Sequence, residues 1–140
     1  MKKLITVILF TAMASIFAVR AQAQVIVIAN PGVKSNEISK NDLRDIFTGA
    51  ATSLPDGTRV VPILLKAGTA HEEFLKAYVG KNDTVFRAGW RSLVFSGQAS
   101  MPKSLEPDAV VVDFVAHNSG AIGYISANAP HEGVKVLTVK

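Results

Sequence analysis

The sequence predicts a single α/β domain that follows a removable N-terminal segment. Apolar, β-branched runs alternate along residues 24–140 with segments whose apolar residues recur at helical spacing. Most of the helical segments begin after a residue that can cap a helix and end near a glycine. The chain contains no cysteine, so its core must stabilise the fold without disulfides. These observations together predict helices packed on a mostly buried sheet.

Residues 1–23 have the layout of a secretory signal peptide. Lys2 and Lys3 form a positive start, residues 4–19 are predominantly apolar and uncharged, and Ala21-Gln22-Ala23 is typical of a signal-peptidase site. The apolar run is shorter than the roughly 20 residues that span a bilayer, which argues against a permanent anchor. No cysteine stands at the junction, which excludes a lipid anchor there. We therefore expect cleavage after Ala23 and an exported, soluble domain at residues 24–140 with no membrane span.

The charge balance argues against a nucleic-acid-binding protein. Three of the 15 Lys and Arg residues (Lys2, Lys3 and Arg20) lie in the predicted signal peptide, whereas all 11 acidic residues follow it. Residues 24–140 thus carry 12 basic against 11 acidic residues, a net charge of +1. Nucleic-acid binding requires a clustered basic surface, which this composition does not supply.

The N-terminal half of the domain contains two predicted strands and one helix. Residues 25–29 form a β-branched run that ends at Asn30-Pro31-Gly32, as expected of a buried strand followed by a turn. Ser39 is placed to cap a helix over residues 40–48, and Gly49 is placed to end it. Residues 60–65 are a second apolar run, in which Pro62 favours an edge position because proline cannot donate to a sheet.

The C-terminal half contains three predicted helices and two closing strands. Helices are expected near residues 70–79, 83–95 and 107–116, each with an inward apolar stripe. In the third of these, we expect Val110, Val111, Phe114 and Val115 to face inward. Strands are expected at residues 121–125 and 134–139, which gives a sheet of about four or five strands. Trp90 falls on the inward stripe of its helix, so we expect it to be buried in the core.

Signatures of enzymes and of metal sites are missing from the sequence. It has no nucleophile-elbow motif, no phosphate-binding P-loop and no His-Glu-x-x-His zinc motif. His71, His117 and His131 are far apart along the chain, and we expect them to be surface or helix-capping residues. The sequence therefore predicts no catalytic residue, no metal site and no cofactor.

One local arrangement predicts a binding site for an anion. The strand over residues 60–65 leads through Lys66-Ala67-Gly68 into a helix that begins near Thr69. The first turn of a helix has free N–H groups and the positive end of the helix dipole, both of which favour an anion. Gly68 permits close approach, Lys66 supplies charge, and we expect the donors to be the backbone N–H groups of Thr69, Ala70 and His71. The alternative is that Thr69, with Glu72, only forms a capping box.

The order of several segments resembles that of periplasmic phosphate-binding proteins of ABC transporters, in the type II periplasmic-binding-protein superfamily. The matching segments are Leu43-Arg44-Asp45-Ile46-Phe47-Thr48-Gly49, Leu54-Pro55-Asp56-Gly57, Val60-Val61-Pro62-Ile63, Trp90-Arg91-Ser92-Leu93-Val94-Phe95-Ser96-Gly97 with Met101-Pro102, and Ser119-Gly120-Ala121-Ile122-Gly123-Tyr124. The resemblance covers essentially all of residues 25–140.

This resemblance implies a single lobe of that fold, with a mixed sheet flanked by helices, located in the periplasm and without enzymatic activity. It implies phosphate or a similar oxyanion as ligand, and an ABC transporter permease or another periplasmic protein as partner. Members of full length have two lobes, and their phosphate loop has an arginine and a serine with no clear counterpart at residues 65–69. The alternative function is therefore a ligand-free interaction or sensory module.

Overall fold

The computed structural model describes residues 25–140. The predicted signal peptide lies outside these residues. Within them, no helix is both long and apolar enough to cross a membrane.

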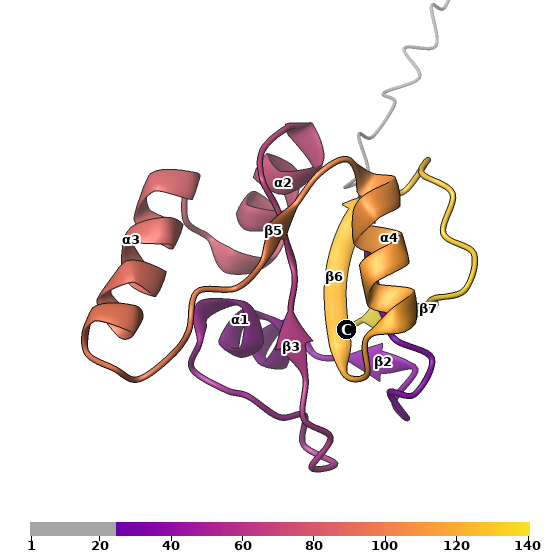
Figure 1. The fold of residues 1–140 in the computed structure, drawn as a ribbon, viewed down its shortest axis with the longest axis horizontal. Helices are drawn as coiled ribbons and strands as arrows, with labels where there is room; N and C mark the ends of the chain where they lie inside the picture. The colour runs from indigo at the N-terminus through magenta and orange to yellow at the C-terminus, as the bar shows by residue number, and fades with distance from the viewer. Residues whose placement is uncertain (1–24) are drawn as a thin grey trace, which may run out of the picture.

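A five-stranded mixed sheet forms the centre of the domain, in the order β2-β7-β1-β6-β3 (Figure 1). The central strand β1 (Val25–Ala29) pairs antiparallel with β6 (Ala121–Ser126) and β7 (Lys135–Val139). The outer strands β2 (Glu37–Ile38) and β3 (Val61–Pro62) each pair in parallel with the strand next to them. This confirms the predicted α/β class, and β3 lies at the edge that Pro62 predicts.

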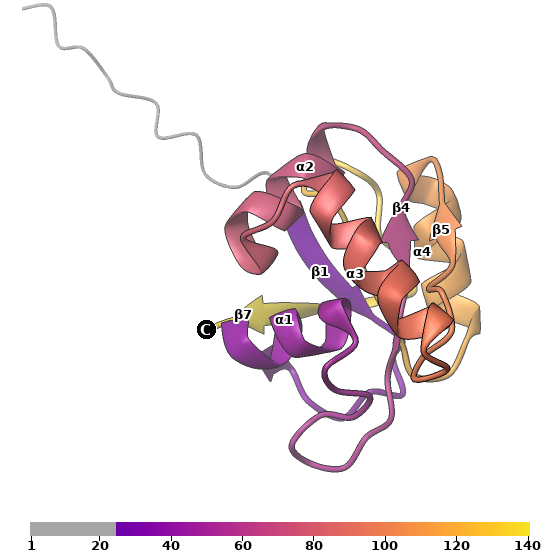
Figure 2. The same cartoon turned by 90° about the vertical axis from the view of Figure 1, so that its left-hand side faces the viewer.

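The two faces of β6 carry different helices, because successive strand residues point to opposite faces. A methyl group added to Gly123 would meet Val111 and Val115 of helix α4 (Asp108–His117) at 3.2 and 3.4 Å. The next residue, Tyr124, stacks on Phe74 of helix α2 (Thr69–Phe74). The sheet is therefore covered by α4 on one face and by α2 on the other (Figures 1 and 2).

Helices α1 (Lys40–Thr48) and α3 (Asp83–Phe95) lie on the same side as α2 (Figure 2). The predicted cap of α1 is confirmed, since the Ser39 side chain accepts a hydrogen bond from the Asp42 N–H at 3.0 Å. Asn82 caps α3 in the same way. Trp90 is 4% exposed, and its indole N–H donates to the Phe47 carbonyl at 2.9 Å, so its predicted burial is also confirmed.

The predicted strand over residues 60–65 is divided between two sheets. The Ile63 N–H donates to the carbonyl of Ile122 in β6, and the Val61 N–H to that of Gly120 just before β6. The N–H groups of Leu64 and Lys66 donate instead to the carbonyls of Lys103 and Leu105. The segment thus becomes β4 (Leu64–Leu65), which pairs in parallel with β5 (Ser104–Leu105) in a small second sheet. The change of partner comes after Ile63, one residue beyond Pro62, which has no N–H to donate.

Several details differ from the sequence-based expectations. The helix expected at residues 70–79 is α2 followed by a π-helical turn, η1 (Leu75–Val79). The expected capping box of Thr69 does not form, because Gly68 occupies the cap position and contributes no side chain. In α4, Val110 is exposed and Val112 is buried instead, since the helix rests on Gly123 through Val111 and Val115. Strands β2 and β5 were not predicted, since two residues are too few for a periodic pattern.

Replacing Gly120 with alanine should destabilise the protein more than the same change at Gly97. Both glycines have left-handed backbones, with φ of +74° and +75°, which cost an L-residue about 1–2 kcal/mol. At Gly120 the new methyl would also lie 2.6 Å from the Arg59 carbonyl oxygen, whereas at Gly97 it would meet no atom within 4 Å. We expect the Gly120 variant to lose a further ~1–3 kcal/mol in urea unfolding. Equal losses would contradict this packing of β3 against the start of β6.

Candidate functional site

The structure brings three of the five predicted anion-site residues to one cavity. Gly68, Thr69 and Ala70 line a cavity of about 500 Å³ at the start of α2, where β4 and β6 end. The side chain of Lys66 lies beside Glu106, with 3.9 Å between Nζ and a carboxylate oxygen. The side chain of His71 is buried and faces the protein interior. The complete set of lining residues is Leu65, Ala67, Gly68, Thr69, Ala70, Glu73, Asp108 and Ser126.

Gly68 precedes α2 and leaves the backbone at the start of this helix accessible from solvent. Its φ of 104° and ψ of 177° belong to a region that side-chain-bearing residues rarely adopt. A Cβ atom placed there would meet nothing within 4 Å, so the surface above this residue is open. The Gly68 carbonyl accepts the Glu72 N–H, which closes the first helical turn. Because this is the first bond of the helix, the N–H groups of Thr69, Ala70 and His71 have no acceptor within the helix.

The ionisable side chains that line the cavity are both acidic. Glu73 and Asp108 contribute acidic side chains, and Asp108 accepts the Ser126 N–H at 3.0 Å. The cavity lining contains no Lys or Arg, and Lys66 pairs outside it with Glu106. The attraction for an anion therefore has to come from backbone N–H groups and from the hydroxyls of Thr69 and Ser126.

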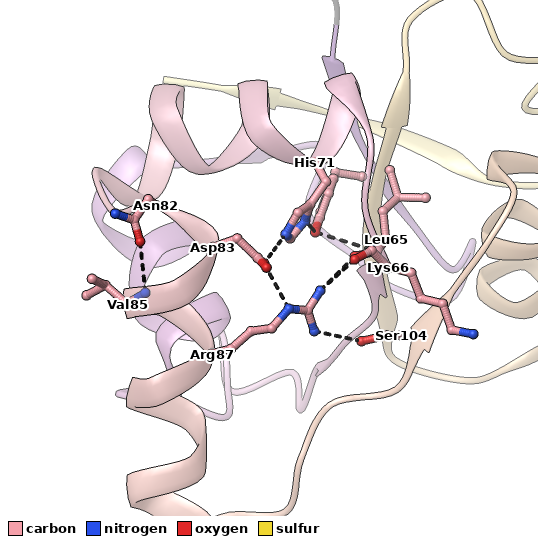
Figure 3. Close-up of polar contacts among 9 residues, drawn as sticks. Leu65, Lys66, His71, Asn82, Asp83, Val85, Arg87 and Ser104 are labelled. Atoms are coloured by element: carbon pink, nitrogen blue, oxygen red, sulfur yellow. Dashed lines mark hydrogen bonds and ion pairs between the residues drawn. The ribbon is translucent and has the colours of Figure 1, made fainter.

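His71 is 1% exposed, and its ring lies between Tyr124 in the interior and Asp83 on α3 (Figure 3). Its Nδ1 contacts the Tyr124 hydroxyl, and its Nε2 lies 2.6 Å from the Asp83 carboxylate. The Tyr124 hydroxyl accepts the Leu65 N–H at 3.2 Å, so its own proton is available to His71 Nδ1. This count of donors assigns the neutral histidine its proton on Nε2, directed at Asp83. The expectation that His71 is a surface or capping residue is therefore wrong.

The ionisation states of the neighbouring groups agree with these hydrogen bonds. Burial raises the pKa of the Tyr124 hydroxyl far above its usual value of 10.0, so it keeps the proton that it donates. Burial also favours the neutral form of Asp83 and is the largest single influence on it. The hydrogen bond from His71 and the charge of Arg87 together outweigh burial and lower the pKa of Asp83 below its usual 3.8. Asp83 is therefore an anion at neutral pH.

Arg87 extends this network to the β4–α2 loop (Figure 3). Its Nε donates to Asp83 at 2.8 Å, and one terminal nitrogen donates to the Lys66 carbonyl at 2.8 Å. Its other terminal nitrogen lies 3.4 Å from the Ser104 hydroxyl. Asp83, Arg87 and Tyr124 were not predicted as site residues, because their contacts join segments that are distant in the sequence. The spacing of Asp83 and Arg87, one helical turn apart, was the only signal available.

The other two histidines do not line the cavity at the start of α2. His117 is exposed and lies 2.8 Å from the Asp113 carbonyl in the last turn of α4, and His131 lies 2.9 Å from the Ala129 carbonyl. Among residues 25–140, no group of three His, Asp or Glu side chains is placed to hold a metal ion.

Removing the Tyr124 hydroxyl should destabilise the protein although the ring remains. Tyr124→Phe leaves the buried Leu65 N–H and His71 Nδ1 without their partner, which should cost about 1–3 kcal/mol. Tyr78→Phe is the matched control, because Tyr78 is partly exposed and should change stability by no more than about 0.5 kcal/mol. Denaturant unfolding measures both. Indistinguishable variants would mean that the Tyr124 hydroxyl is not a structural hydrogen-bonding group.

Several solved structures of phosphate transport and substrate-binding proteins share the fold of the described residues. The chain is similar to an ABC-type phosphate transport receptor from Vibrio cholerae, with a TM-score of 0.55 and 15% identity over 83% of this chain and 46% of that one. A putative phosphate ABC transporter substrate-binding protein with bound phosphate from Clostridium perfringens has a TM-score of 0.62 and 16% identity, over 83% and 44%. PstS from Borrelia burgdorferi has a TM-score of 0.54 and 15% identity, over 84% and 47%.

The likeness is one of fold and covers only part of each relative. No protein-family model matches the sequence, and no curated protein sequence is significantly similar to it. The chain spans less than half the length of the solved structures named above. Its described residues therefore have the fold of a single lobe of the phosphate substrate-binding proteins of ABC transporters.

Proposed function

We propose that this protein is an exported solute-binding domain for phosphate or a similar oxyanion, linked to ABC-type phosphate uptake or sensing. The observation that carries the proposal is the cavity at the start of α2, which Gly68, Thr69 and Ala70 line. Helix geometry leaves N–H groups without intrahelical acceptors at such a position, and these favour an anion. The cavity occurs in a fold shared with phosphate substrate-binding proteins. Export and cleavage after Ala23 are part of the proposal, as is a location in the periplasm.

The donors and acceptors around the cavity favour phosphate over sulfate. Backbone N–H groups and the hydroxyls of Thr69 and Ser126 can donate to the oxygens of either anion. Phosphate near neutral pH still carries a proton, which an acidic side chain such as Asp108 can accept. Sulfate has no proton to donate, so the same side chain repels it. A cavity with both N–H donors and carboxylates therefore selects a protonated oxyanion.

Magnitudes predict weak binding by this domain alone. Micromolar affinity requires about 8 kcal/mol. A helix N-terminus supplies roughly 0.3–2 kcal/mol, and each hydrogen bond to a charged group about 1.5–3 kcal/mol. An open cavity loses much of this to water. We therefore propose millimolar affinity for the isolated domain, and tighter binding once a transporter component or another periplasmic protein covers the cavity.

The acidic side chains also support a second candidate from another class. Lys66 is paired with Glu106, and Glu73 and Asp108 line the cavity, so no lysine or arginine side chain faces an incoming anion there. A lobe that had lost its ligand and acted as an interaction or sensory module would have this charge pattern. Binding measurements separate the two candidates.

The intact mass of the exported protein establishes its first residue and so tests cleavage after Ala23. Isothermal titration calorimetry of the same protein tests the proposed binding. We expect millimolar phosphate to release or absorb heat and sulfate to bind more weakly. Added salt should weaken the binding, because exposed charges are screened within about 10 Å at 0.1 M. Thr69→Ala should cost about 1 kcal/mol in binding.

Gly68→Val should abolish this binding, because it changes the loop backbone and covers the open approach. Gly57→Val is the matched control, since Gly57 has a similar φ of +87° and an equally open position in an exposed turn. Absence of heat and of thermal stabilisation with phosphate, alone or with a candidate transporter partner, would favour the interaction module. Equal affinities for phosphate and sulfate would contradict the role of the acidic side chains.

A further inference from the structure

We propose that Arg87 is a positioning residue that directs the Ala67 N–H into the cavity at the start of α2. What this N–H binds rests on the proposed function, but its orientation does not. Ala67 lines the cavity, whereas Arg87 is on α3 and does not. The sequence-based set of donors began at Thr69, so Ala67 is an additional donor and Arg87 acts through it.

The first step is that Arg87 fixes the carbonyl that precedes Ala67. Its guanidinium donates to the Lys66 carbonyl at 2.8 Å and lies 3.5 Å from the Leu65 carbonyl. Asp83 and Ser104 contact the other guanidinium nitrogens, and the side chain is only 20% exposed. Four contacts with groups on three segments define the position of the guanidinium, so the Lys66 carbonyl is fixed as well.

The second step follows from the geometry of the peptide unit. The C=O and N–H groups of a trans peptide point in opposite directions. The bond between Lys66 and Ala67 is trans, since the cis bond among the described residues is Glu106–Pro107. A Lys66 carbonyl that points at Arg87 therefore turns the Ala67 N–H away from Arg87. The preceding N–H, that of Lys66, donates to the Leu105 carbonyl at 3.1 Å and is not available to a ligand.

The third step is that the guanidinium shape matters more than its charge. Arginine presents several N–H donors in a rigid plane, so it can hold Asp83 and the Lys66 carbonyl together. Lysine would supply the charge from a single flexible point. Asp83 is itself held by His71, and His71 by Tyr124, so the sheet determines where the guanidinium lies.

Nuclear magnetic resonance of the exported protein tests the orientation without any ligand. Arg87→Met and Arg87→Lys should both shift the Ala67 amide resonance and speed its exchange with solvent. Arg91→Met is the matched control, because Arg91 lies one turn further along α3, is exposed and has the same charge. It should leave the Ala67 amide unchanged. An Ala67 amide that is unaffected in both Arg87 variants would overturn the proposal.

Phosphate titration of the same variants tests the consequence. We expect both Arg87 variants to lose about tenfold in affinity, as for one hydrogen bond to an anion, and Arg91→Met to lose little. Wild-type affinity in Arg87→Lys would overturn positioning, because charge alone would then suffice. If the wild-type protein binds no phosphate, the proposed function fails and the amide measurement still decides the role of Arg87. If Arg87→Met does not fold, Arg87→Lys, which retains the positive charge, is sufficient for both the amide measurement and the phosphate titration.

Discussion

The hydroxyl of Tyr124 is the polar group on which the arrangement of this domain depends. Tyr124 is fully buried in β6 and stacks on Phe74 of α2 with 3.8 Å between ring centroids. A buried hydroxyl without partners would be costly, and this one contacts both the Leu65 N–H and His71 Nδ1. The sheet, the β4 strand and the α2 helix therefore meet at one oxygen atom.

A short series of hydrogen bonds connects the Tyr124 hydroxyl to the β4–α2 loop at the surface. The His71 Nε2–H donates a hydrogen bond to Asp83, Asp83 accepts one from Arg87, and Arg87 donates to the Lys66 carbonyl. The β4–α2 loop is thus fixed from the interior and needs no contact from its solvent side. A loop held in this way keeps its backbone groups in place, which would reduce the ordering cost of the proposed binding. The carboxylates of the cavity lining, which has no Lys or Arg, would limit the proposed affinity for an anion.

Local signals in the sequence were enough to predict most of the fold. Ser39 and Asn82 cap their helices through contacts three residues away, and Gly49 and Gly80 end theirs with left-handed backbones. The short strands β2 and β5 escaped prediction because their pairing depends on partners far along the chain. The division of residues 61–65 between two sheets has the same origin, since each N–H selects an acceptor that the local sequence does not specify.

The candidate site was predictable only in its backbone part. A glycine before a helix start is visible in sequence, and Gly68, Thr69 and Ala70 do line one cavity. The burial of His71 was not visible, because it follows from Tyr124 and Asp83, which lie 53 and 12 residues away. The acidic side chain of Asp108 likewise reaches the cavity from another helix.

Hydrogen exchange of the Leu65 amide measures how firmly the buried Tyr124 hydroxyl ties the start of the β4–α2 loop to the sheet. Leu65 ends a strand of only two residues next to an exposed loop, so without Tyr124 its N–H would exchange like a frayed strand end. We predict that it exchanges as slowly as the amides of the central strand β1, through global unfolding. Exchange as fast as that of the loop at residues 66–68 would contradict this role of the Tyr124 hydroxyl.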